Sequence, residues 1–134
     1  MQGSIFVPEL NPRPTFYANY SPDYALSPNL ADIVGRYVGK PGSMDGSDGV
    51  TFDISGSGDI TGSGNGGCKF SGTIKPRTSG NAYNITVTFG ASPCQYAGAT
   101  VNGVSYFDRA SNIAYAMASI SAGSAKFITI ATKQ

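Results

Sequence analysis

Apolar and polar residues alternate most regularly in the segment between Cys68 and Cys94. Residues 68–75 carry apolar or small side chains at every second position, and residues 83–89 repeat the pattern. This period is typical of half-buried β-strands. Residues 77–81, Arg-Thr-Ser-Gly-Asn, have the composition of a turn, and Pro76 marks a point where a strand stops donating ladder hydrogen bonds. The segment therefore predicts a β-hairpin.

The register of this hairpin follows from matching the apolar faces of its two strands. The faces coincide in one alignment, which pairs Phe70 with Phe89, Gly72 with Val87 and Ile74 with Ile85. A slip of one residue would set apolar side chains against Thr86 and Thr88. We therefore expect a single register.

The only two cysteines of the chain, Cys68 and Cys94, lie at the two ends of the hairpin. We predict a disulfide between them, which requires the chain to fold back after Ser92-Pro93. Two buried free thiols are the alternative, and a redox-active pair is disfavoured because there is no Cys-x-x-Cys spacing. A disulfide would indicate an oxidising compartment.

Strand-like alternation continues on both sides of the hairpin. It covers residues 33–39, 50–55, 59–62, 96–108, 112–119 and 125–132. Residues 62–67 are expected to form a flexible hairpin tip, and Asn102-Gly103 to interrupt its strand as a turn or a bulge. The pattern predicts an all-β fold, an antiparallel meander of about eight strands that forms a small barrel or a sandwich.

The side chains that would fill a barrel come from the apolar parity of each strand. We expect the interior to be formed by Phe52, Phe70, Ile85, Val87, Tyr115 and Phe127. In residues 112–119 both faces are apolar or small, a pattern typical of a strand that is buried on both sides or lies beside a close neighbour.

The first part of the chain has a different character. Residues 5–30 hold five of the eight prolines, and repeated proline opposes both helix and central strand. We divide the chain into an extended Pro/Tyr-rich arm, residues 1–32, and a single β domain, residues 33–134. Ser27-Pro28 predicts a short helix at the end of the arm, with Ser27 as its N-cap.

The arm is rich in aromatic residues, which a disordered tether would lack. We therefore expect it to pack on the domain. The alternatives are such a tether, or a patch that a partner protein covers, formed by Phe16, Tyr17, Tyr20 and Tyr24.

Composition agrees with an all-β protein and narrows the possible partners. Eighteen glycines and many Ser, Thr and β-branched residues favour short strands joined by tight turns. Nine basic residues against eight acidic ones give no electrostatic reason to expect nucleic acid as a partner. No stretch approaches the roughly 20 apolar residues of a membrane-spanning helix. A signal segment or a lipid anchor is expected upstream of this chain.

No constellation of residues indicates catalysis. The chain has no histidine, and no serine lies in a nucleophile-elbow motif, so we expect a protein that is not an enzyme and needs no cofactor. Asp45 and Asp48 lie in a Gly-rich loop that suggests calcium, but the ligand spacing favours a plain turn, and we expect no metal site. Asp53 and Asp59 are more simply explained as solvated residues beside a turn than as a catalytic pair.

Residues 35–39, Gly-Arg-Tyr-Val-Gly, resemble the first strand of small exported bacterial β-barrel and lipoprotein-type domains, and loosely the entry strand of lipocalin-like barrels. Lipocalins usually carry a Trp in that motif, and this chain has none. The resemblance implies a periplasmic or extracellular protein. We expect a binding module for another protein, such as an inhibitor, an immunity protein or an envelope accessory protein. The alternative is a lipocalin-like carrier of an apolar small molecule inside the barrel.

Overall fold

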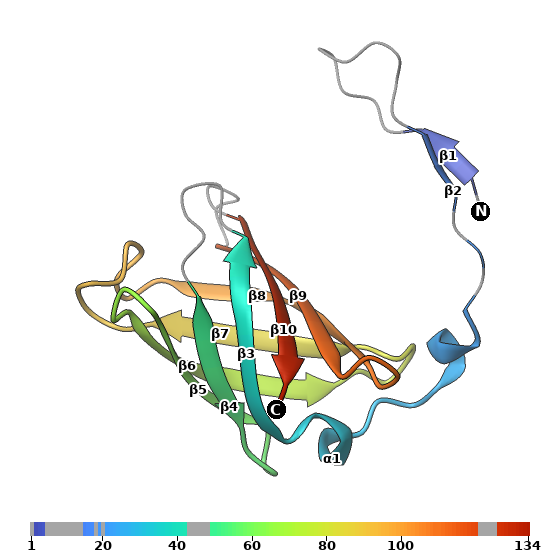
Figure 1. Ribbon diagram of the computed structural model, residues 1–134, viewed down its shortest axis with the longest axis horizontal. Coiled ribbons are helices and arrows are strands. Elements are labelled where there is room, and N and C mark those ends of the chain that lie inside the picture. The colour runs from blue at the N-terminus through green and yellow to red at the C-terminus, as the bar shows by residue number, and fades with distance from the viewer. Residues whose placement is uncertain (1, 5–14, 18, 20, 43–48, 121–125) are drawn as a thin grey trace.

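The computed structural model describes residues 2–4, 15–17, 19, 21–42, 49–120 and 126–134. Eight strands close into a barrel (Figure 1). They are β3 (Gly35–Gly42), β4 (Val50–Ile54), β5 (Asp59–Gly64), β6 (Lys69–Pro76), β7 (Tyr83–Phe89), β8 (Thr100–Asp108), β9 (Ile113–Ile120) and β10 (Lys126–Lys133). Consecutive strands pair antiparallel, and β10 pairs with β3 to complete the ring. The predicted all-β meander is confirmed, and it is a barrel.

The remaining elements precede the barrel. β1 (Gln2–Ser4) and β2 (Thr15–Tyr17) form a separate antiparallel pair, which Figure 1 shows apart from the barrel. A 3-10 helix, η1 (Pro22–Ala25), and a short α-helix, α1 (Leu30–Ile33), lead into β3. Tyr17 is 82% exposed and Tyr24 is also mostly exposed.

The barrel closes where its first and last strands meet. β10 runs along β3 from the pair Ile128–Gly42 to the pair Lys133–Tyr37. At the middle of this seam a Cβ on Gly39 would lie 2.6 Å from the Cβ of Ala131, so only glycine allows the two backbones to approach this closely. Closure removes the unpaired strand edges that an open sheet would present.

The hairpin β6–β7 has the register that the sequence predicts, with Phe70 opposite Phe89, Gly72 opposite Val87 and Ile74 opposite Ile85. The predicted disulfide is also present. Cys68 precedes β6 and Cys94 lies in the loop after β7, with their Cα atoms 4.5 Å apart. The bond therefore fastens the β7–β8 connection to the start of β6.

Two glycine-containing segments differ from expectation. Residues 62–64 belong to β5 and not to a flexible tip, because Gly62 faces inward where a Cβ would lie 2.6 Å from the Cβ of Phe52. Likewise Asn102-Gly103 does not interrupt β8, since both residues keep their ladder partners on β7 and β9. In both places glycine allows neighbouring strands to pack closely inside the barrel. The sequence pattern predicts turns at these glycines, but the strands continue through them.

The start of α1 also differs from expectation. Its N-cap is Asn29, whose side chain accepts a hydrogen bond from the Ala31 N–H at 3.0 Å, and Ser27 lies outside the helix. The Ser-Pro signature acts six residues earlier, where Ser21 caps η1. The Asn29 backbone has an extended conformation and makes two hydrogen bonds with the Tyr83 hydroxyl. The Asn29 N–H donates to this hydroxyl, and the hydroxyl donates to the Asn29 carbonyl, so Asn29 is the residue held in place to cap α1.

The packed core lies at the end of the barrel that α1 covers. Ile33 of α1 is 2% exposed and joins a cluster that contains Tyr37, Ile54, Ile60, Ile74, Tyr83, Ile85, Phe107 and Ala131. The Tyr37 ring is fully buried, stacks on Phe52 at 5.0 Å and meets Phe107 edge-on at 6.3 Å. We call this the closed end.

Nested truncations should separate the arm from the helix that covers the closed end. Removal of residues 1–20 should leave the thermal unfolding midpoint unchanged, because the described elements β1 and β2 make their main contacts with each other. Removal of residues 1–33 should lower it by at least about 10 °C, because loss of the buried Ile33 costs roughly 2–5 kcal/mol. Circular dichroism melting measures both, and an equal loss in the two truncations would contradict this division.

Candidate ligand cavity

The barrel encloses a cavity of about 310 Å³. Its larger wall comes from β4 to β7, where branched and aromatic side chains point inward: Phe52, Ile54, Ile60, Phe70, Ile74, Ile85, Val87 and Phe89. Its opposite wall comes from β9, which contributes Ala114, Ala116 and Ala118. The cavity exists because three methyl groups on one wall do not reach the rings and branched chains on the other.

Five of the six side chains expected in the interior line this cavity: Phe52, Phe70, Ile85, Val87 and Phe127. The expectation for Tyr115 is wrong. Its side chain points outward, is 40% exposed and stacks on Tyr106 with ring centroids 6.3 Å apart. The inward places on β9 go to alanines, since Ala114 lies opposite the buried Phe107 and a second large side chain has no room there.

The cavity reaches the end of the barrel opposite α1, which we call the mouth. Gly64, Gly66, Cys68, Pro93 and Gln95 line it there, and all come from the β5–β6 and β7–β8 connections or the strand end beside them. The Cys68–Cys94 disulfide joins these two connections. It therefore holds these two connections together at the mouth.

Aromatic rings gather just inside the mouth. The ring of Phe127 packs on Phe89 at 5.2 Å and meets Tyr96 edge-on at 5.4 Å, while Phe70 and Phe89 are 6.5 Å apart. A ligand that enters the cavity would pass these rings, which offer it apolar contact and edge-to-face packing.

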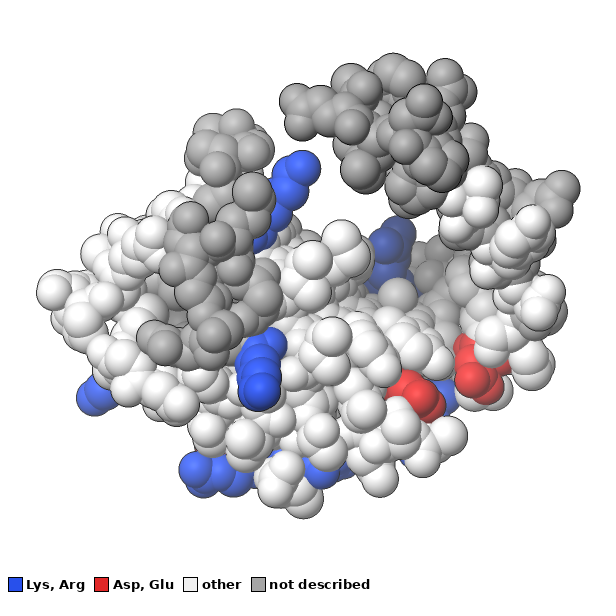
Figure 2. All heavy atoms as spheres, turned by 45° about the horizontal axis from the view of Figure 1, so that its top comes forward, with Lys and Arg blue, Asp and Glu red and all other residues white. Residues whose placement is uncertain are grey.

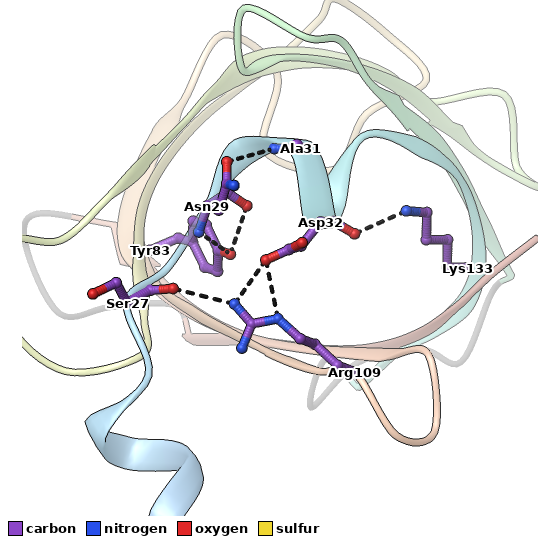
Figure 3. A network of polar contacts seen from close by, with 7 residues as sticks. All are labelled: Ser27, Asn29, Ala31, Asp32, Tyr83, Arg109 and Lys133. Atoms are coloured by element: carbon purple, nitrogen blue, oxygen red, sulfur yellow. Dashed lines mark hydrogen bonds and ion pairs between the residues drawn. The ribbon is translucent and has the colours of Figure 1, made fainter.

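The closed end is held by a polar network that joins α1 to three strands or their ends (Figure 3). Arg109, in the β8–β9 turn, donates to the Asp32 carboxylate at 2.7 Å and to the Ser27 carbonyl at 3.2 Å. The Lys133 ammonium donates to the Asp32 carbonyl at 2.8 Å, and the Tyr83 hydroxyl donates to the Asn29 carbonyl at 3.0 Å. These contacts keep α1 across this end of the barrel.

Of the other candidate residues, the described Tyr17, Tyr24, Asp53 and Asp59 are not among those that line the cavity. Phe16 lies in β2, while Tyr20, Asp45 and Asp48 lie outside the described residues. The Asp59 carboxylate accepts hydrogen bonds from the Ser55 and Ser57 hydroxyls of its own turn, and Asp53 lies opposite Thr61. Among the described residues no three His, Cys, Asp or Glu side chains form a group that could hold a metal ion.

The outer surface of the barrel has one apolar face that the sequence reasoning missed. Met117 is 60% exposed, and across β8, β9 and β10 it is surrounded by other outward apolar side chains: Val104, Tyr106, Tyr115, Ile128 and Ile130. We call these six residues the outer apolar face. The signal was the alternation of residues 112–119, in which both parities are apolar. Elsewhere the outer surface carries polar side chains that form hydrogen bonds between neighbouring strands, such as Thr86 with Asn102 and Thr88 with Thr100 on β7 and β8.

Charge is sparse on the view in Figure 2, where most basic side chains are separated by uncharged residues and acidic groups lie close together at the right. No helix among the described residues is long and apolar enough to cross a membrane.

Fold and cavity together define an up-and-down antiparallel β-barrel that is closed by a helix at one end and hollow toward the other. No protein-family model, curated protein or solved structure matches the chain.

Two buried tyrosines at the closed end lead us to predict how the stability of the protein changes at alkaline pH. Burial, with a contribution from nearby Tyr83, raises the pKa of Tyr37 above its usual 10.0, and burial raises the pKa of Tyr83 as well. The folded state therefore keeps these protons at a pH where the unfolded chain has lost them. Stability should be fully present below about pH 10 and fall as the pH rises above it.

Urea unfolding midpoints at about pH 8 and about pH 11 measure this effect. Tyr37→Phe should lose about 1 kcal/mol at the lower pH, with the hydrogen bond to the Ile33 carbonyl, and should lose less than the wild type between the two pH values. Exposed Tyr115→Phe is the matched control and should behave as the wild type. An unchanged pH dependence in Tyr37→Phe would contradict the assignment.

Proposed function

We propose that the protein binds one small apolar molecule inside its barrel. The observation that carries this proposal is the cavity of about 310 Å³ with its almost wholly apolar wall and its mouth beside the disulfide. Small-molecule sites occupy roughly 300–1,000 Å³, so this cavity suits one compact ligand. Eight-stranded barrels have an interior that is either filled by side chains or holds one small ligand. This agrees with the lipocalin-like alternative expected from the sequence.

The energetic cost of the cavity supports a ligand. At about 24 cal/mol per Å³ an empty cavity of this size costs on the order of 7 kcal/mol, an upper figure because water can enter at the mouth. The whole stability of a domain is roughly 5–15 kcal/mol. A larger residue at Ala116 would remove part of this cost, so the retained empty space supports a role in binding.

The proposed place of action is the periplasm or the extracellular space. The disulfide is compatible with an oxidising compartment and supports this location. There the protein would carry or capture an apolar molecule without catalysis, as the lack of histidine led us to expect.

A larger side chain inside the cavity should weaken ligand binding. We expect N-phenyl-1-naphthylamine to gain fluorescence on binding, and Ala116→Leu to weaken its binding at least about tenfold. The same variant should melt no lower than the wild type, because the added side chain fills existing space. Fluorescence titration and thermal melting give the two readouts.

Two controls keep this test specific. Thr73→Leu adds the same side chain to the outer surface, and Met117→Lys places a charge in the outer apolar face; both should bind the dye as the wild type does. Loss of dye binding in Met117→Lys with retention in Ala116→Leu would overturn the proposal, because the dye would then bind outside the barrel.

A second candidate function is the expected binding of a protein partner, with the outer apolar face as its surface. Exposed apolar side chains on three neighbouring strands favour it. Lys40 lies opposite Ile130 on the adjacent strand, and Lys126 precedes Ile128 on the same face. The partner that fits is therefore a protein with an apolar surface flanked by acidic residues.

The partner hypothesis predicts that Met117→Lys lowers binding by at least about tenfold, whereas Thr73→Lys and Ala116→Leu leave it unchanged. The assay is retention of a purified partner that mass spectrometry has identified from an envelope extract. A partner that is retained equally by Met117→Lys, or that has no acidic surface, would exclude this face.

A further inference from the structure

We infer that the ligand is an uncharged molecule with an apolar body and one carbonyl or hydroxyl group, and that this group enters first and hydrogen-bonds to Ser105 and its neighbour Thr129. The inference rests on the proposed function and names the class of ligand. It comes from Ser105 and Thr129, two hydroxyl-bearing side chains in a mostly apolar cavity whose other polar side chains, Gln95 and Tyr96, belong to the β7–β8 connection at the mouth.

Ser105 and Thr129 share one level of the inner wall. The strand register places Ser105 of β8 opposite Ala116, and Ala116 opposite Thr129 of β10. Both residues line the cavity, and Ser105 is 7% exposed. On its other side Ser105 lies opposite Tyr83, whose hydroxyl is already bonded to Asn29. Ser105 therefore lies toward the closed end, and Thr129 is the next inward residue after Phe127 on β10.

Neither hydroxyl has a hydrogen-bond partner within the described part of the chain, although every fully enclosed side-chain N or O atom there has one. Ala116, between them, offers only a methyl group. Leaving a buried hydroxyl unpaired is unfavourable, so a ligand oxygen that bonds to it gains more than the same oxygen in an all-apolar site. In the absence of ligand, water entering at the mouth would serve the same groups.

The inference that the ligand is uncharged follows from what lines the cavity. No charged side chain is among the described residues of its wall. Lys133 lies on the inward row at the closed end, but its ammonium donates to the Asp32 carbonyl and lies 5.8 Å from the centre of the Phe107 ring. A carboxylate would therefore lose its hydration without gaining a counter-charge, which is strongly unfavourable.

The orientation follows from the distribution of rings. Phe70, Phe89 and Phe127 pack together near the mouth, while the hydroxyls lie below them. A molecule with its polar group at Ser105 would keep its apolar body against these rings. The reverse orientation would leave the hydroxyls unpaired.

Three matched probes test this inference by displacement of N-phenyl-1-naphthylamine from the full chain: naphthalene, 2-acetylnaphthalene and 2-naphthoate. At neutral pH the ketone should bind about threefold to tenfold more tightly than the hydrocarbon, the range expected for one hydrogen bond. The carboxylate should bind at least about tenfold more weakly than the ketone. Ser105→Ala and Thr129→Val should each reduce the preference for the ketone and leave naphthalene affinity unchanged.

The controls make each outcome decisive. Thr73→Val removes a hydroxyl from the outer surface and should keep the preference for the ketone. Ser105→Thr should also keep this preference, because threonine retains a hydroxyl at the position where Ser105→Ala removes it. If naphthalene binds as tightly as the ketone, or if the preference survives in both Ser105→Ala and Thr129→Val, the inference is overturned and the proposed function stands. If neither the dye nor any probe binds to the folded protein, the proposed function itself is overturned.

Discussion

The pairing of β10 with β3 is the contact on which the rest of the structure depends. Once the last strand joins the first, the circumference of the barrel is set, and every inward side chain must share one enclosed volume. The narrow approach of Gly39 to Ala131 makes this seam possible. It also gives the Gly-Arg-Tyr-Val-Gly motif a structural explanation, because Tyr37 fills the closed end while Gly39 lies in the seam. The cavity is what remains when an alanine wall faces an aromatic one.

The two ends of the barrel are stabilised by different kinds of interaction. At the closed end the stacked rings of Tyr37 and Phe52 and the Arg109–Asp32 pair hold α1 in place, with hydrogen bonds made to its carbonyls or to its cap. At the mouth a covalent bond holds two connections together. The bond ties the β7–β8 connection to the start of β6 across a sequence separation of 26 residues. Rigid support at both ends thus surrounds an interior that is not completely filled.

The candidate site was partly predictable from sequence. Alternation identified five cavity-lining side chains, since Phe52, Phe70, Ile85, Val87 and Phe127 lie on strands with one clearly apolar parity. It failed at Tyr115, where both parities are apolar and hydrophobicity alone cannot choose between them. Ser105 and Thr129 were missed for the opposite reason. A hydroxyl in a strand is normally a surface residue, although Thr129 shares the inward parity of Phe127 on β10 and Ser105 shares that of Phe107 on β8.

The sequence by itself determined the strand content, the β6–β7 register and the disulfide, because clear alternation, turn residues between two strands and a single pair of cysteines each leave one arrangement. Only the tertiary structure decided which face of β9 points inward, that residues 62–64 and 102–103 stay in their strands, and that Asn29 is the N-cap of α1. Each of these depends on a packing partner that the local pattern does not identify: Phe107 beside Ala114, Phe52 beside Gly62, Tyr83 beside Asn29. Local patterns state what a segment can form. Packing inside a closed barrel of fixed circumference decides which side chains it can hold.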